Sequence, residues 1–370
     1  MATMRRSSAL VALVAACAAQ PNMSCSSNGT ACAPPTWAPR WELVDSTICQ
    51  PGGPSHTSGF FSMPVEQPWG LVSLDWTVAL SIWNKTGLHN ATIEAVSREG
   101  CRLLKANHSA TKCFIYHNME LALESIESQR AAMYPGEASY DPTLFLHRPS
   151  GPAAGTIYNE RNTPGDQYFW NYTLDKTKAF FRDSVMASIA YPEVDGTFAD
   201  DVNGIPDEHG HIPSQLNLSA ADLDFYRYHT SIANQMLVDA TIAAGKYSWA
   251  AFGNQDGVGD GPSNSTCASW MRERCNAAWQ GRATTQGIDG RAFNQSLAAF
   301  LVTRGPWAFL GYGGVSDMRD WRREFLWSVG APTPAGAICA EGPAGVFSRP
   351  WTHGVASLDC NSWSAMVPAV

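Results

Sequence analysis

The stretch VDGTFADD, residues 194–201, joins a short run of strand-forming residues to a pair of carboxylates. Valine, threonine and phenylalanine favour extended backbone, so the stretch is predicted to be a buried β-strand with acidic residues at its end. Side chains alternate between the two faces of a strand, which places Phe198 and Asp200 on one face and Thr197 on the other. Asp200 and Asp201 are therefore expected to diverge, with only one of them at the centre of the edge where the strand ends.

Similar apolar runs recur along the chain and alternate with amphipathic stretches. Further strands are predicted at residues 71–76, 113–118, 247–253 and 308–313. The clearest helix signal is a capping box from Ser219 to Asp222, which opens a helix that is expected to stop at Gly245. A second helix is predicted directly after Asn118, with that residue as its cap. Strands that alternate with helices are typical of a parallel sheet.

We therefore predict an α/β fold, a (β/α)8 TIM barrel with antiparallel strands at its C-terminal end. The strand signals fall short of the eight that a closed barrel needs, so further strands are expected within residues 140–175 or 280–310. Several predicted strands end in Asp, Asn, Trp or Tyr. Because all strands of a parallel barrel end at one rim, where such folds place their active sites, these residues predict a functional site there.

The chain divides into four predicted segments: a signal peptide at residues 1–19, a Cys-, Pro- and Ser-rich leader at 20–58, a barrel at 59–338 and closing strands at 339–370. The signal peptide is indicated by two arginines, a short apolar run and small residues suited to cleavage. A bacterial lipid-attachment site at Cys17 is the weaker alternative. The leader is expected to be tied down by disulfides.

Two further features predict the secretory route and a secreted, extracellular protein. Nine Asn-x-Ser/Thr sequons indicate N-glycosylation, at Asn22, Asn28, Asn84, Asn90, Asn107, Asn171, Asn217, Asn264 and Asn294. The 10 cysteines are expected to form mostly disulfides in an oxidising compartment. Short sequence separations suggest the pairs Cys101 with Cys113, Cys267 with Cys275, and Cys339 with Cys360.

Composition excludes several classes of partner. A formal net charge of -8 and the lack of any run of lysine or arginine argue against nucleic acid. No apolar run beyond the signal peptide is long enough to span a bilayer, so we expect no membrane partner after cleavage. The oligomeric state is left open.

Catalysis is expected to centre on the acidic end of the opening strand. Asp200 is the first candidate for a base or nucleophile, and Asp201 is its alternative. A glycosidase also needs a protonated carboxyl group, for which Asp256 in a Gly-rich turn ranks first and Glu208 second. Glu120 and Asp75 are further candidates for that acid, whereas loop capping or ion pairing is the structural alternative for all of them.

No metal or organic cofactor is predicted. Asp207, Glu208, His209 and His211 lie close together in sequence, but their spacing matches neither a zinc nor an EF-hand signature. The chain also lacks the Gly-x-Ser-x-Gly motif of serine hydrolases.

Aromatic and amide side chains near the predicted strand ends favour a carbohydrate partner. The candidate substrate-binding residues are Asp75, Trp76, Tyr116, Asn118, Gln167, Trp170 and Asn254. Tryptophan faces stack on sugar rings and amides bond their hydroxyl groups. For any single tryptophan, core packing is the structural alternative.

These motifs together resemble a family of glycoside-hydrolase-like TIM-barrel proteins, the hypothetical glycosyl hydrolases. The family's strand motif DG-x-F-x-D-D/N matches Asp195–Asp201. NQSLAAFLVTRGPWAFLGYG (294–313) is similar to its helix and Gly-rich strand, and SVGAPTPAG (328–336) precedes FSRPWTHGV (347–355), which is similar to the family's F-x-R-x-[FW]-x-x-G element. The resemblance covers roughly residues 65–360. It implies a barrel with a glycosidase-like rim.

The sequence thus leaves two functional hypotheses. One is a secreted glycoside hydrolase that cleaves O-glycosidic bonds with two carboxylates, Asp200 as base or nucleophile and Asp256 as acid. The other is a catalytically degenerate barrel that binds carbohydrate without cleaving it.

Overall fold

The computed structural model describes residues 41–50, 67–87, 91–152, 154–159, 165–202, 216–250, 258–259, 261–280, 284–311, 321–334 and 338–368, to which all structural statements here refer. The predicted signal peptide, most of the leader, and three predicted site residues lie outside these ranges. Those three residues are Glu208, Asn254 and Asp256.

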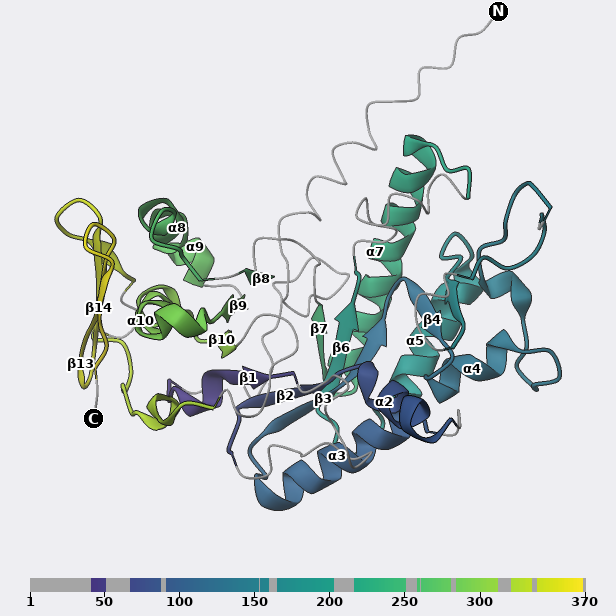
Figure 1. Cartoon of the computed structure of the whole chain (residues 1–370), viewed down its shortest axis with the longest axis horizontal. Helices are drawn as coiled ribbons and strands as arrows, with labels where there is room; N and C mark the ends of the chain where they lie inside the picture. Colours follow the sequence, from purple (N-terminus) through teal and green to yellow (C-terminus); the bar gives the residue numbers. More distant parts are fainter. Residues whose placement is uncertain are drawn as a thin grey trace, which may run out of the picture.

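Eight parallel strands form one sheet, in the order β7-β6-β3-β2-β1-β10-β9-β8. Their bounds are β1 (Thr47–Cys49), β2 (Leu71–Leu74), β3 (Lys112–Asn118), β6 (Gly196–Asp200), β7 (Tyr247–Ala250), β8 (Val258–Gly259), β9 (Thr284–Gly287) and β10 (Ala308–Gly311). In Figure 1 the sheet is curved, with β1, β2 and β3 at the base, β6 and β7 rising on one side, and β10, β9 and β8 on the other. The predicted α/β class with a parallel sheet is confirmed.

The strand order follows the chain around the curve, since the first parallel strand, β1, pairs with the last, β10. Among the described residues no pairing joins β7 to β8, so the structure establishes a curved sheet and not a closed barrel. The predicted closed (β/α)8 barrel is therefore not confirmed by the described residues.

Two short strands of the sheet, β1 and β8, lie where the sequence did not predict them. β1 falls within the predicted leader, although its pairing with β2 and β10 makes it part of the sheet. β9 lies in one of the two windows in which further strands were expected. In the other window, β5 (Gln167–Phe169) pairs antiparallel with β4 (Leu121–Leu123) outside the main sheet. Strands of two to four residues carry too little periodicity to be recognised in a sequence.

Helices cover the outer face of the curved sheet (Figure 1). The α-helices are α2 (Thr77–Thr86), α3 (Ile93–Asn107), α4 (Glu127–Met133), α5 (Asp175–Ser188), α7 (Ala220–Ala243), α8 (Cys267–Arg274), α9 (Ala277–Gln280) and α10 (Phe293–Thr303). Short 3-10 helices are η1 (Val44–Ser46), η2 (Pro142–Leu144), η4 (Gly290–Ala292) and η6 (Arg323–Leu326). The predicted capping box of α7 is present, with reciprocal bonds between Ser219 and Asp222.

The helix predicted directly after Asn118 is wrong. The Asn118 side chain accepts hydrogen bonds from the backbone N–H groups of Glu120 and Leu121, at 2.8 Å each. These bonds stabilise a turn that leads into β4, and α4 begins only at Glu127. An asparagine that follows a strand can cap a tight turn as readily as a helix, because both offer free N–H groups.

The two faces of the sheet can be told apart by their partners. Cys113 of β3 is bonded to Cys101 of α3, and Ala199 of β6 clusters with helix residues of α5 and α7, so these side chains point outward. By alternation, Phe114 and Phe198 point to the concave inner face. Five buried side chains from β1, β2, β3, β7 and β10 form an apolar cluster on this inner face, namely Ile48, Leu71, Phe114, Tyr247 and Phe309.

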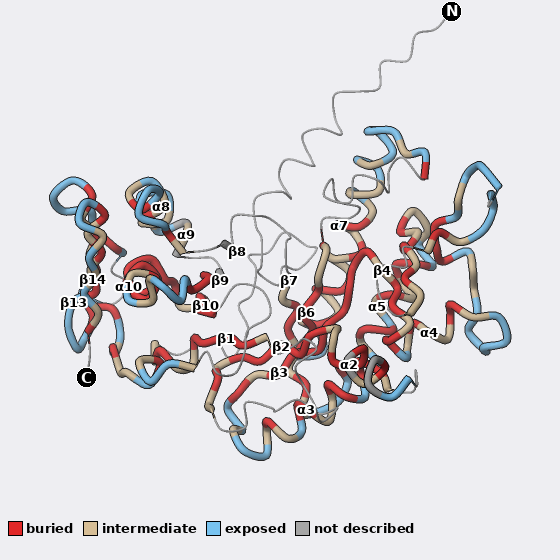
Figure 2. The backbone as a smooth tube through the Cα atoms, viewed as in Figure 1, coloured by how far each residue is buried: buried red, intermediate tan, exposed pale blue. Residues whose placement is uncertain are grey.

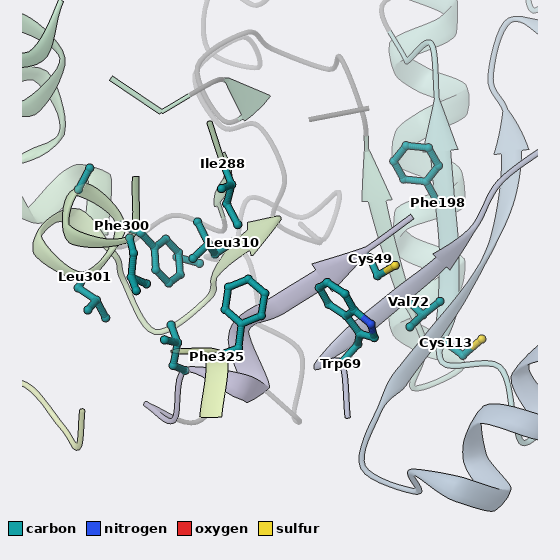
Figure 3. Close-up of a cluster of buried hydrophobic side chains, with 14 of the residues drawn as sticks. Cys49, Trp69, Val72, Cys113, Phe198, Ile288, Phe300, Leu301, Leu310 and Phe325 are labelled. Atoms are coloured by element: carbon teal, nitrogen blue, oxygen red, sulfur yellow. The ribbon is translucent and has the colours of Figure 1, made fainter. Parts of the chain in front are cut away.

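The largest core cluster joins the sheet to α3, α10 and the C-terminal strands. Figure 3 shows part of it, from Phe300 and Ile288 at one end to Val72 and Cys113 at the other. Figure 2 shows that the central strands β2, β3 and β6 are buried along most of their length.

The predicted C-terminal antiparallel strands are confirmed as a four-stranded sheet. It contains β11 (Ala340–Glu341), β12 (Val346–Trp351), β13 (Gly354–Asp359) and β14 (Ser364–Met366), in that order. This sheet packs against α10, where the Gln295 side chain donates to the carbonyl of Trp363 at 3.0 Å.

One of the three suggested disulfides is correct. Cys101 is bonded to Cys113, but Cys267 is bonded to Cys360 and Cys275 to Cys339. The two corrected bonds tie α8 to the C-terminal sheet across separations of 93 and 64 residues. Pairing the cysteines by sequence proximity was wrong because Cys267 and Cys275 lie at opposite ends of α8. The fold brings Cys360 and Cys339, which come from the C-terminal segment, to these two ends. Three disulfides are typical of a protein from an oxidising compartment.

No helix in the described part of the chain has the length and apolar character that crossing a bilayer requires.

Candidate active site

The structure brings together five of the predicted residues at the rim where the strands end. Asp200 is the last residue of β6, Tyr116 and Asn118 lie at the end of β3, and Asp75 directly follows β2. Each lies an even number of residues from an inner-face side chain of its own strand. Asp201, one residue beyond the strand, completes the group, which we call the rim cluster.

Hydrogen bonds link the members of the rim cluster. The Tyr116 hydroxyl donates to Oδ2 of Asp200 at 2.8 Å. The Asn118 amide donates to Oδ2 of Asp201 at 2.7 Å and to the Tyr116 oxygen at 3.0 Å. The backbone N–H of Asp201 donates to Oδ1 of Asp200 at 3.0 Å. Two side chains of β3 thus fix both carboxylates at the end of β6.

The expected divergence of Asp200 and Asp201 is wrong. Asp201 has a φ of 49°, in the left-handed region that aspartate tolerates better than most residues. This conformation ends the alternation of the strand, and Asn118 then holds the Asp201 carboxylate on the same side as Asp200. Strand periodicity cannot predict such a turn, because the information lies in one backbone angle beyond the strand.

Asp75 is held rigidly beside the pair. Its Oδ1 accepts from the backbone N–H and the hydroxyl of Thr77, at 2.9 and 2.8 Å. Its Oδ2 accepts from the side-chain amide of Gln50 at 3.0 Å. Gln50 follows β1 and was not predicted, because no sequence pattern indicates that β1 belongs to the sheet.

The environment of the rim cluster opposes ionisation. Burial raises the pKa of Asp200 to about 7, and the negative charges of Asp201 and then Asp75 add to the rise. Burial also raises the pKa of Asp75 despite its three hydrogen bonds. The pKa of Tyr116 lies well above its usual value, because its hydroxyl is buried and faces the charges of Asp200 and Asp201. Tyr116 therefore stays protonated and can donate to Asp200.

Aromatic rings separate the rim cluster from the apolar cluster below it. Phe198 contacts Tyr116 with ring centroids 5.8 Å apart and Trp249 with centroids 4.6 Å apart. Burial among apolar groups disfavours the charged form of a carboxylate, in line with the effect of burial on the pKa of Asp200.

Two other predicted residues, Trp76 and Gln167, line a small hollow. Its remaining lining residues are Leu80, Leu123, Glu124, Ser125 and Asp166. Trp76 is adjacent to Asp75 in the chain, whereas Gln167 comes from β5.

Trp170 does not lie at the site. It is 3% exposed and packs among Phe145, Tyr172 and Phe181 in a separate core cluster. Trp170 is therefore a core residue, which is the structural alternative to sugar binding that applies to any single tryptophan. Glu120 is also buried on that side, where burial and then the charge of Glu120 raise the pKa of Tyr172 well above its usual value.

His117, next to Tyr116 in sequence, is a structural residue. It is buried on the outer face between the hydroxyls of Thr197 and Ser188, at 2.8 and 2.9 Å. Burial lowers its pKa to about 3, so the ring is neutral at physiological pH. Within the described ranges, no group of three His, Cys, Asp or Glu residues is arranged to hold a metal ion.

No protein-family model matches the chain, and no curated protein matches it in sequence. Among solved structures, it is similar to a GH31 dextranase from Flavobacterium johnsoniae complexed with glucose, at 12% identity and a TM-score of 0.43, over 75% of this chain and 37% of the other. A GH31 family sulfoquinovosidase from E. rectale shows 14% identity and a TM-score of 0.45 over 82% and 45%. An alpha-N-acetylgalactosaminidase from Bifidobacterium bifidum shows 10% and 0.44 over 89% and 58%.

The chain spans less than two thirds of the length of each of these three proteins. Similarity at this level does not place the chain in any of their families.

Proposed function

We propose that this protein is a secreted hydrolase of O-glycosidic bonds and that the rim cluster is its catalytic centre. The observation that carries the proposal is the pair Asp200 and Asp201, fixed by Tyr116 and Asn118 with a raised pKa at Asp200. A structural ion pair would include a cationic side chain and a lowered pKa. Carboxylates that are pressed together and partly buried are instead typical of sites that move protons.

Glycoside hydrolysis uses one carboxylate as nucleophile or base and one carboxylic acid as proton donor. In our proposal Asp200 acts in the first role, with Tyr116 orienting its carboxylate through the bond to Oδ2. Asp201 is its alternative, and its charge helps to set the proton affinity of Asp200. Asp256 supplies the acid, with Glu208 as the second choice.

The proposed architecture is a closed (β/α)8 barrel with the leader and the C-terminal sheet attached to it. Its support is the strand order, in which β1 pairs with both β2 and β10 and only the junction of β7 and β8 is open.

Secretion and N-glycosylation are part of the proposal. Three disulfides support an oxidising compartment. Four sequon asparagines are exposed and so accessible to a glycan: Asn107, Asn217, Asn264 and Asn294.

A substrate panel tests the proposed function. The secreted protein is incubated with aryl glycosides and polysaccharides, and sugar release is measured for wild type, Asp200→Asn and Asp224→Asn. Asp224 is an exposed residue on α7 and serves as the matched control. The proposal expects release by wild type and by Asp224→Asn, but not by Asp200→Asn.

Two results would contradict hydrolysis at this site. Equal release by all three proteins would remove Asp200 from the mechanism. Binding of glycans by all three without any release would support the competing function, a barrel that only binds carbohydrate.

A further inference from the structure

The side chain of Asn118 uses all of its hydrogen-bonding positions within the protein. Its carbonyl oxygen accepts from the backbone N–H groups of Glu120 and Leu121, at 2.8 Å each. Its amide nitrogen donates to Oδ2 of Asp201 at 2.7 Å and to the Tyr116 oxygen at 3.0 Å. An amide side chain has two acceptor positions and two N–H donors, so this one has none left for a substrate hydroxyl group.

Only one orientation of this amide agrees with its neighbours. If it were turned end for end, its NH2 group would face the two backbone N–H groups and its oxygen would face the Asp201 carboxylate. Donors would then meet donors, and acceptors would meet acceptors. Asn118 is buried, and a buried polar group that loses its hydrogen bond is strongly destabilising. The turn into β4 therefore determines which end of the amide faces the rim cluster.

The amide in turn fixes the direction of the Tyr116 hydroxyl. A phenol has a single hydrogen to donate. Because the Tyr116 oxygen accepts from Asn118, that hydrogen is left for Oδ2 of Asp200, at 2.8 Å. Tyr116 is buried and its ring contacts Phe198, which holds the hydroxyl in this place. The hydrogen bonds thus run in one direction, from the turn through Asn118 and Tyr116 to Asp200.

The two carboxylates receive different donors as a result. Asp200 accepts from the Tyr116 hydroxyl at Oδ2 and from the backbone N–H of Asp201 at Oδ1. Asp201 accepts from the Asn118 amide. The bonds to Asp200 favour its ionised form and oppose the effect of burial. A carboxylate has about four acceptor positions, so about two remain on Asp200 for a proton or for bond formation with a substrate.

We infer that Asn118 is a positioning residue, which binds no substrate but directs the Tyr116 hydroxyl to Asp200 and thereby assigns the role of nucleophile or base to Asp200 instead of Asp201. This catalytic role rests on the proposed function, whereas the direction of the hydrogen bonds does not. The titratable groups that act on Asp200 from neighbouring elements are Tyr116 on β3, Asp75 after β2 and Asp201 beyond β6.

Asn118→Asp tests the inference with almost no change of shape. The introduced carboxylate can still accept from the two N–H groups of the turn. When ionised it offers no donor to Tyr116 or Asp201, and it adds a negative charge to the rim cluster. Tyr116→Phe is the second variant, because it keeps the ring and removes only the hydroxyl that donates to Asp200. Both substitutions disfavour the ionised form of Asp200, so both should raise its pKa.

Asn361→Asp is the matched control. Asn361 lies in the turn between β13 and β14, where its amide donates to the carbonyl of Ala344 at 2.8 Å and to Oδ1 of Asp359 at 3.1 Å. The substitution removes two N–H donors and adds one charge, as Asn118→Asp does, but it does so in the C-terminal sheet.

The first readout needs no substrate. Each protein is compared with its own Asp200→Asn form by urea denaturation between pH 4 and 9, so that any general loss of stability cancels. Because the folded state binds the Asp200 proton more tightly, the difference in stability grows as the pH rises and levels off above the folded-state pKa. The levelling-off should move from near pH 7 to about pH 8 in Asn118→Asp and in Tyr116→Phe, but not in Asn361→Asp. An unchanged value in Asn118→Asp would overturn the inference, and so would an unchanged value in Tyr116→Phe.

The second readout uses the best substrate of the panel. A positioning residue acts on the chemical step, so Asn118→Asp should lower kcat at pH 7 by up to roughly 10²-fold while KM stays nearly unchanged, and kcat should recover towards pH 9. Asn361→Asp should match wild type at every pH. A residue that bound the substrate would instead raise KM, so a raised KM with unchanged kcat in Asn118→Asp would contradict the positioning role.

The two readouts separate this inference from the proposed function. If wild type cleaves glycosides but the levelling-off does not move, the hydrolase stands and the role of Asn118 is contradicted. If no glycoside is cleaved but the levelling-off moves as expected, the hydrolase is contradicted and the order of the hydrogen bonds stands.

Discussion

Two effects disfavour the charged form of the Asp200 carboxylate, namely burial and the neighbouring negative charge of Asp201. Its folded-state pKa, about 7, is higher than the value near 3.9 of an aspartate in an unfolded chain. The folded state therefore binds this proton more tightly than the unfolded state does. The resulting stabilisation is present below the unfolded pKa and is lost as the pH rises through about 7.

The first prediction concerns stability. Asp200→Asn removes the charge that the fold opposes, so it should stabilise the protein at pH 8 by on the order of 1 kcal/mol and have little effect at pH 4. Thermal unfolding of wild type and variant at both pH values measures this. An equal shift at the two pH values would show that Asp200 does not carry the raised pKa.

The second prediction concerns the pH dependence of the rate. If Asp200 acts as nucleophile or base, it must be ionised, so kcat/KM should fall on the acid side with a midpoint near its pKa of about 7. Initial rates between pH 4 and 9 on the best panel substrate provide the profile. A rate that is highest at low pH and falls through neutrality would instead make the Asp200 and Asp201 pair the proton donor.

At the level of single residues, alternation along the strand predicts that Asp200 shares a face with Phe198 and not with Ala199, whose side chain contacts the helices of the outer face. Tyr116, Asn118 and Asp75 could be predicted only as residues near strand ends. Alternation could not place Asp201, whose position depends on a left-handed backbone angle. It also could not identify Gln50, because a contact between Gln50 and Asp75 depends on which strands are neighbours in space.

Among the elements, β6 ends at the acidic pair Asp200 and Asp201. Its first residue, Gly196, determines how closely β6 can approach β7. A Cβ atom on Gly196 would lie 2.0 Å from the carbonyl oxygen of Tyr247, far inside van der Waals contact. Glycine is thus required by the close approach of two backbones.

The third prediction follows from this contact. Gly196→Ala should force β6 and β7 apart and lower the free energy of unfolding by about 3 kcal/mol. Gly290→Ala is the control, because no heavy atom lies within 4 Å of its added Cβ, and it should change stability by less than about 0.5 kcal/mol. Urea denaturation measures both. Equal stability of the two variants would mean that β6 and β7 are not paired as described.

Elements with strong periodicity could be predicted from sequence, and short ones could not. The strands containing Val72, Ile115, Phe198 and Leu310 were located because their apolar runs are continuous. β1 and β8 are too short to show a pattern, and their role depends on neighbours that come from elsewhere in the chain.

On the scale of the whole molecule, two disulfides join α8 to the C-terminal sheet. The bond between Cys267 and Cys360 closes a loop with a separation of 93 residues, against 12 for Cys101 and Cys113. Longer loops lose more conformational freedom in the unfolded state when they are closed.

The fourth prediction is that the paired change Cys267→Ser and Cys360→Ser costs about 2–4 kcal/mol of stability, and more than Cys101→Ser with Cys113→Ser. Urea denaturation of the two double variants, each compared with wild type, gives the order. The opposite order would indicate that the C-terminal sheet contributes little to the stability of the fold.

The central claim is that the rim cluster cleaves glycosidic bonds, and kcat/KM for Asp200→Asn on the best substrate of the panel tests it most directly. With folding established by thermal unfolding, the account predicts a loss of roughly 10²–10⁴-fold relative to wild type, while Asp224→Asn stays at the wild-type rate. A folded Asp200→Asn protein that cleaves the substrate as fast as wild type would contradict the account.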